Sequence, residues 1–126
     1  MANQNLTGHS KYSVTITVDK SSSGIELRPF QEKAIERMSE KIKVRDFAGI
    51  LVLPTGAGKT LTSAYWIAEN ILDKGGKVLW IAHRHELLDQ AYITFERLCH
   101  SDVFRSKNEL RVQLLSGVHD QPIQVD

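Results

Sequence analysis

The stretch LPTGAGKT, residues 53–60, decides the fold of this chain. It follows the continuous apolar run AGILVL (48–53), which is typical of a strand buried on both faces. After it, apolar residues recur at helical spacing as far as Leu72 and stop at DKGG (73–76), a typical helix end. A glycine-rich turn between a buried strand and an amphipathic helix is the context of a phosphate-binding loop.

The residue types of this turn suit phosphate chemistry. Gly56 and Gly58 allow backbone angles and close approaches that a Cβ would prevent, so the amides that follow can point at phosphate oxygens. The N-terminus of the next helix adds free N–H groups and the positive end of its dipole. Lys59 can place a charge between the β- and γ-phosphates, and the Thr60 hydroxyl can ligate Mg²⁺. We therefore expect ATP and Mg²⁺ to bind through Thr55, Gly56, Ala57, Gly58, Lys59 and Thr60, of which Lys59 and Thr60 also act in catalysis.

One position departs from the strict phosphate-loop pattern. The pattern G-x-x-x-x-G-K-[ST] has glycine at its first position, where this sequence has Leu53. A chance glycine-rich turn is the alternative. The GKT triplet, the strand before it and the helix after it favour the phosphate loop.

The rest of the chain alternates between predicted strands and helices. Residues 12–18 alternate strictly between apolar and polar types, which predicts a half-exposed strand. The other predicted elements are a helix over 29–44, a strand over 78–82, a helix over 87–98 and a strand over 109–115. Two consecutive β–α–β units predict an α/β fold with a parallel sheet, and the first strand would sit at its edge or in a small flanking element.

Composition limits the class of protein. The 126 residues correspond to one small domain or part of a larger one, and 41% hydrophobic residues exclude wholesale disorder. A net charge of +1 indicates no overall electrostatic attraction to nucleic acid or membranes. The single cysteine, Cys99, excludes an internal disulfide framework, and no apolar run is long enough to span a bilayer. We expect a cytoplasmic protein with no membrane partner.

Three motifs together resemble superfamily 2 helicases and translocases. The form P-T-G-x-G-K-T, opened by Leu53, resembles motif I of that superfamily. Upstream, LRPFQEKAI (27–35) resembles its L-R-P-[YF]-Q element. Downstream, VLWIAHRHELLDQ (78–90) is similar to motif Ia of the DEAD/DEAH-like branch that contains type I and type III restriction motor subunits. This resemblance covers roughly residues 25–120 and implies a parallel-sheet P-loop NTPase (RecA-like) domain.

The resemblance also implies further site residues. Gln31 would hydrogen-bond the adenine edge, because an amide offers a donor and an acceptor together, and Arg28 would lie nearby. His83, Arg84 and Gln90 would contact the backbone of a nucleic acid, DNA rather than RNA.

Each of these assignments has an alternative. Gln31 could be an exposed helix residue. Arg84 could form a salt bridge with Glu86 or Asp89 at the helix start. The two histidines beside Arg84 could be a metal pair, although no third ligand has a suitable spacing.

The sequence contains no apolar strand that ends in Asp-Glu, which is motif II of the family. Such carboxylates hold Mg²⁺ and polarise the attacking water. We therefore expect residues 25–126 to be an incomplete RecA-like domain 1, after an N-terminal extension with an edge strand over 1–24. A sheet without its motif II strand would expose strands of the buried type, which favours association.

The expected function follows from these motifs. In the full-length protein the domain would couple ATP hydrolysis to nucleic-acid remodelling, together with the remainder of the helicase core. The isolated chain would bind ATP·Mg²⁺ weakly and hydrolyse little of it. The alternative is a truncated nucleotide-binding or regulatory module without turnover.

Overall fold

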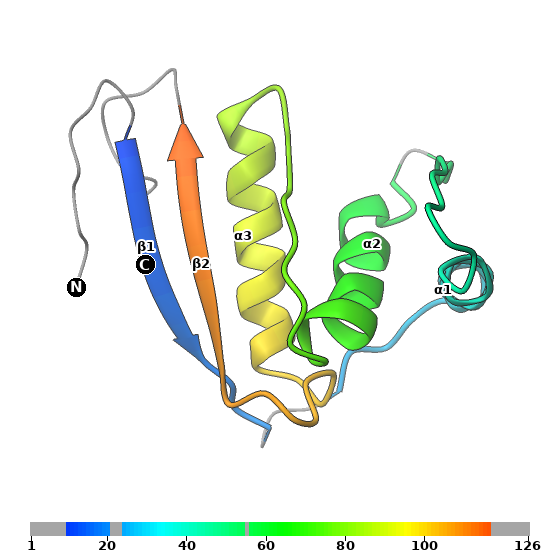
Figure 1. Cartoon of the computed structure of the whole chain (residues 1–126), viewed down its shortest axis with the longest axis horizontal. Helices are drawn as coiled ribbons and strands as arrows, with labels where there is room; N and C mark the ends of the chain where they lie inside the picture. The colour runs from blue at the N-terminus through cyan, green and yellow to red at the C-terminus, as the bar shows by residue number, and fades with distance from the viewer. Residues whose placement is uncertain (1–9, 21–23, 55, 117–126) are drawn as a thin grey trace.

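A computed structural model describes residues 10–20, 24–54 and 56–116 of the chain. Three helices and a pair of strands stand side by side (Figure 1). In chain order the elements are β1 (Ser10–Thr17), α1 (Pro29–Lys41), α2 (Lys59–Ile67), a π-helical turn η1 (Ala68–Leu72), α3 (His85–Cys99) and β2 (Glu109–Ser116). Of the helices described, none is both long enough and apolar enough to cross a membrane.

The two strands form an antiparallel ribbon. Its register runs from Ser10 opposite Ser116 to Thr17 opposite Glu109. Ile16 lies opposite Leu110, and both side chains are buried. The predicted strands over 12–18 and 109–115 are therefore present, and the alternation of residue types put one apolar face toward the core.

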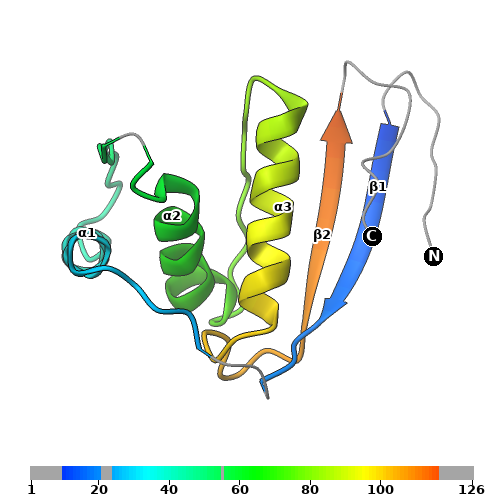
Figure 2. The ribbon, with the colours of Figure 1, turned by 180° about the vertical axis from the view of Figure 1, so that it is seen from behind.

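Helix α3 lies between this ribbon and α2, as Figures 1 and 2 show from opposite sides. The core forms where these elements meet. Its buried members are Ile16, Ala64, Ala68, Leu72, Tyr92, Leu98, Cys99, Val103, Phe104, Leu110 and Leu114. Helix α1 packs on the other side of α2, where the indole N–H of Trp66 donates a hydrogen bond to Ser39 Oγ at 3.0 Å.

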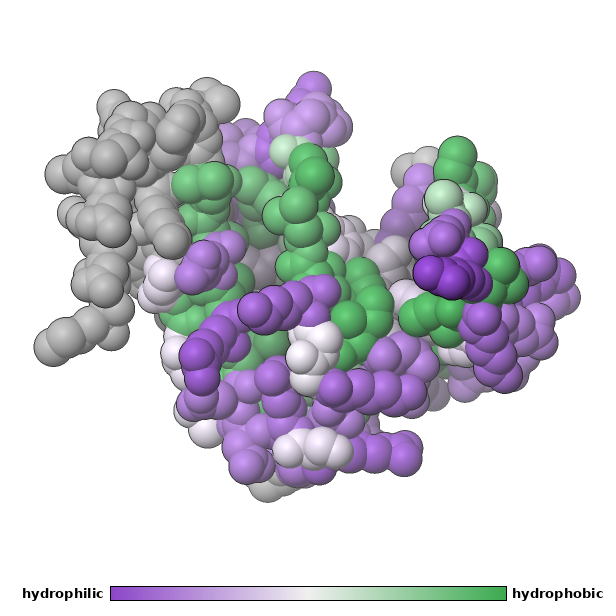
Figure 3. Space-filling model, in the orientation of Figure 1, coloured by the Kyte–Doolittle hydropathy of each residue, from purple (hydrophilic) through white to green (hydrophobic). Residues whose placement is uncertain are grey.

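The predicted parallel sheet is not seen among the described residues. Residues 48–53 and 77–82 are extended but make no backbone hydrogen bond within that part of the chain. Most of their side chains are exposed: Ile50 is 93% exposed and Leu79 83%. Figure 3 shows the resulting hydrophobic surface between α2 and α3, where residues 77–82 lie.

The physical reason is that neither segment lies beside another strand with which it could pair among the described residues. A sheet requires another strand at about 4.8 Å, and the neighbours of both segments are helices, whose backbone groups are already paired. The α/β class is thus confirmed, whereas the only described sheet is the antiparallel ribbon of β1 and β2.

Asp73 ties the end of η1 to the loop before β2. Its Oδ1 accepts hydrogen bonds from the backbone N–H groups of Arg105, Ser106 and Lys107 at 3.1, 2.9 and 3.0 Å. Partial burial raises the pKa of the carboxyl, but these three amides and the charge of Lys20 outweigh it and hold the pKa below its ordinary value.

We expect Asp73→Ala to lower the free energy of unfolding by about 1–2 kcal/mol at pH 7, because three amides lose a charged acceptor that is largely in water. Since the pKa of Asp73 is depressed in the folded state, its contribution is complete above the unfolded pKa and is lost as the pH falls through the folded pKa. Urea titrations of wild type and variant should therefore converge in strong acid. Glu40→Ala, at an exposed carboxylate, is the control. If Asp73→Ala lowered the free energy of unfolding by the same amount at pH 7 and in strong acid, the ionised Asp73 would not be the source of the effect.

The fold also shifts the pKa of Cys99. Its burial, with a smaller contribution from the charge of Glu96, raises the pKa of the thiol to about 12. Because the thiolate is the reactive species, we expect no reaction of the native chain with a disulfide reagent at pH 8 and full reaction in urea. Rapid stoichiometric labelling without denaturant would show that the end of α3 is not packed as described.

Candidate functional site

The predicted phosphate loop forms a tight turn into α2. Gly56 and Gly58 have φ angles of 78° and 74°, a region that favours glycine. The Ala57 N–H donates to the Pro54 carbonyl at 3.0 Å and closes the turn. The Gly58 carbonyl then accepts from both the N–H and the hydroxyl of Thr62, at 2.9 and 2.8 Å. The glycines thus let the chain reverse and start a helix within a few residues.

This turn leaves the N-terminus of α2 available to an anion. Its N-cap is Gly58, which has no side chain to cap the first N–H groups. Lys59 is exposed and has no hydrogen bond or ion pair within the described part of the chain, and Thr60 is half-buried. A helix dipole and one cation therefore converge on the turn. Thr55, also predicted here, lies outside the described residues.

Gln31 connects α1 to the phosphate loop. Its side chain is only 4% exposed, so it is not the exposed helix residue of the alternative interpretation. Its Oε1 accepts from the Arg28 N–H at 2.9 Å, and its Nε2 donates to the Ala57 carbonyl at 3.2 Å. A Cβ added at Gly58 would lie 2.7 Å from this Nε2, so a side chain at residue 58 would displace the Gln31 amide from its place against the loop.

The sequence interpretation missed this contact between Gln31 and the loop. A signal for half of it was present, since Gln31 stands three residues after Arg28, the N-cap of α1, with Pro29 between them. That spacing is typical of a side chain that reaches back to the N-cap amide. The contact with Ala57 spans 26 residues and no local pattern indicates it. The adenine contacts of Gln31 and Arg28 remain predictions, and Arg28 is exposed at the start of α1.

The predicted nucleic-acid residues cluster at the start of α3. Arg84 is its N-cap in extended conformation, and His83, Arg84 and Gln90 are all exposed. In the described part of the chain Arg84 has no ion pair, and the neighbouring contact is His85 Nε2 to Glu86 Oε1 at 3.5 Å. The described residues contain no group of three side chains suited to hold a metal ion.

Both predicted sites lie at the same end of the molecule. Figures 1 and 2 show the N-termini of α2 and α3 pointing in the same direction, away from the loop before β2. The phosphate loop and the exposed start of α3 are thus on one side of the structure.

Comparison of the sequence with models of known protein families identifies the family of this chain. A family model described as "Type III restriction enzyme, res subunit" matches residues 24–122, most of the chain. The chain belongs to this ResIII family. The match contains the phosphate loop, Gln31 and the start of α3, and membership implies an ATP-dependent helicase or translocase ATPase module. Comparisons with curated proteins and with solved structures found no match.

We expect Gln31→Leu to destabilise the chain by about 1–3 kcal/mol, because it leaves the Arg28 amide and the Ala57 carbonyl without their buried partner. Urea unfolding followed by circular dichroism measures the difference. Gln90→Leu makes the same substitution at an exposed position of α3 and serves as the control. If both variants lose the same stability, Gln31 does not hold the loop.

Proposed function

We propose that this chain is the ATP-binding part of a DNA helicase or translocase related to restriction motor subunits. The observation that carries the proposal is the turn at Gly58. It brings to the same point a helix N-terminus without a side-chain cap and Lys59, which has no ion pair with any described residue, and phosphate is the anion that such a turn accommodates.

The residues present fit ATP·Mg²⁺. Backbone amides from Gly56 to Thr60 would surround the phosphates, Lys59 would neutralise the β- and γ-phosphates, and Thr60 would ligate Mg²⁺. Gly58 has a φ angle of 74°, which favours glycine, and it lies close to the Gln31 amide. The carboxamide of Gln31 uses one N–H and one lone pair in its present contacts, which leaves one of each for the adenine edge, with Arg28 beside it.

The start of α3 would contact the nucleic acid. His83, Arg84 and Gln90 are exposed, and α3, like α2, has no side-chain cap at its N-terminus. A guanidinium and free helix amides together suit a phosphate of the DNA backbone. Since this end of α3 faces the same way as the phosphate loop, nucleotide and nucleic acid would bind on one side of the molecule.

Turnover would depend on groups beyond those described here. Hydrolysis of the γ-phosphate needs a metal-holding carboxylate and a cation that stabilises the transferring phosphoryl group. We propose that residues 25–126 act as part of RecA-like domain 1 in the cytoplasm. Motion along DNA would need the remainder of the helicase core.

We expect Lys59→Ala to weaken the binding of a fluorescent ATP analogue about 10- to 100-fold, since a charge-assisted contact to phosphate is worth about 1.5–3 kcal/mol. A fluorescence titration with Mg²⁺ measures the dissociation constants. Lys74→Ala removes an equally exposed lysine outside the loop and should leave them unchanged. Equal binding by wild type and Lys59→Ala would exclude the phosphate-loop assignment.

A further inference from the structure

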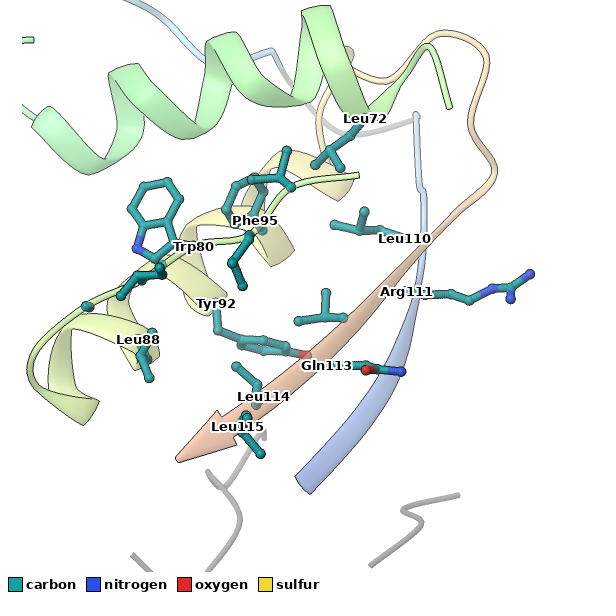
Figure 4. Close-up of a pocket in the computed structure, with 16 residues that line it drawn as sticks. Leu72, Trp80, Leu88, Tyr92, Phe95, Leu110, Arg111, Gln113, Leu114 and Leu115 are labelled. Atoms are coloured by element: carbon teal, nitrogen blue, oxygen red, sulfur yellow. The ribbon is translucent and has the colours of Figure 1, made fainter. Parts of the chain in front are cut away.

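The apolar cavity of this structure ends beside a polar site. The cavity lies between β2 and the extended segment 77–82, and its volume is about 360 Å³. Tyr92 and Phe95 of α3 line it on one side (Figure 4). Among the described residues that line it, Arg111 is the only charged one, and its side chain points away from the cavity in Figure 4. A site for a charged ligand begins directly after Leu72, which is the last residue of η1 and also lines the cavity.

Three successive backbone N–H groups converge on one carboxylate oxygen at the loop before β2. The amides of Arg105, Ser106 and Lys107 donate to Asp73 Oδ1 at 3.1, 2.9 and 3.0 Å. The partners are 32 to 34 residues apart in sequence, so the contact is not a local turn or a helix cap. Successive amides that point at one oxygen form the kind of concavity in which proteins bind anions. Asp73 thus occupies this loop as a ligand occupies a binding site.

A cation is held beside the same loop. Lys20 Nζ donates to the carbonyl oxygen of Arg105 at 2.7 Å, and its charge favours the ionised form of Asp73. The hydrogen bond that holds this ammonium group is made to the backbone, so removal of the carboxylate leaves the group in place. Asp102 of the same loop carries an opposing charge, which the side chains of Arg105 and Lys107 outnumber.

The core shapes this loop independently of its ligand. Val103 and Phe104, directly before the three amides, are 4% and 0% exposed, and Leu110 behind them in the chain is also buried. Arg105 and Ser106 themselves are exposed, so the amides lie at the surface, where a free anion can reach them. A loop that is anchored in this way should keep its shape when the carboxylate is removed.

We propose that the amides of residues 105–107, with the ammonium group of Lys20 beside them, form a preformed oxyanion site for a carboxylate, and that Asp73 is its tethered ligand. This site is separate from the phosphate loop and does not depend on the proposed function. Because Asp73 is part of the same chain, its effective concentration at the site is high, and the native protein takes up no free carboxylate. Once emptied, the site binds a free carboxylate of the same size.

An NMR titration with sodium formate tests the proposal. Asp73→Ala empties the site, and formate has the size of the carboxylate that is removed. The signals to follow are the amide N–H groups of Arg105, Ser106 and Lys107 at pH 7, with sodium chloride at equal concentration as the control for ionic strength. Asp73→Asn is the matched control variant, since it keeps a neutral acceptor of the same size in the site and leaves no room for formate.

We expect the three signals of Asp73→Ala to shift together and to saturate with one dissociation constant in the millimolar range. Wild type and Asp73→Asn should show no such shift. Adding Lys20→Ala to Asp73→Ala should weaken formate binding by about two- to fivefold, as for an exposed ion pair. A dissociation constant unchanged by Lys20→Ala overturns the part of the site assigned to Lys20.

Three results overturn the whole proposal. The first is that the signals of Asp73→Ala do not saturate with formate, or respond equally to chloride. The second is that wild type or Asp73→Asn shifts as much as Asp73→Ala. The third is that Asp73→Ala is unfolded in both salts, because the loop would then need its own ligand in order to form.

Discussion

The last turn of α3 buries Leu98 and Cys99 completely, in one core cluster with Phe104 of the following loop. The rest of the described structure depends on this packing of α3. A two-stranded ribbon is at best marginally stable alone, and β1 and β2 obtain their buried face from α3. On its other side α3 supports α2, which carries the phosphate loop. Hydrophobic burial on both sides of one helix thus positions the candidate site.

The phosphate loop is held to this core by specific polar contacts. Gln31 joins α1 to the loop, and the hydrogen bond between Trp66 and Ser39 joins α1 to α2. Such contacts, one buried and one partly buried, select one arrangement of otherwise adaptable helices. The site is therefore a joint product of a local turn and of the packing of two helices that are distant in sequence.

Much of the secondary structure was predictable because it depends on local chemistry. Residue alternation with a period of two predicted β1 and β2, and apolar residues at helical spacing predicted the three helices. The glycine positions predicted a turn with positive φ angles at Gly56 and Gly58. The parallel sheet could not be settled in this way. The apolar runs 48–53 and 78–82 indicate that these segments favour burial, but they do not indicate which strand pairs with them.

By itself, the sequence determined the three helices, the two outer strands β1 and β2, the phosphate-loop turn and the family, because periodicity and glycine placement act over a few residues. Only the tertiary structure decided that β1 pairs antiparallel with β2 and that Gln31 bonds to the Ala57 carbonyl. It also decided that segments 48–53 and 77–82 make no backbone hydrogen bond with other described residues. These outcomes depend on which distant backbone groups meet in space, and hydrogen-bond pairing over long separations leaves no periodic mark in the sequence.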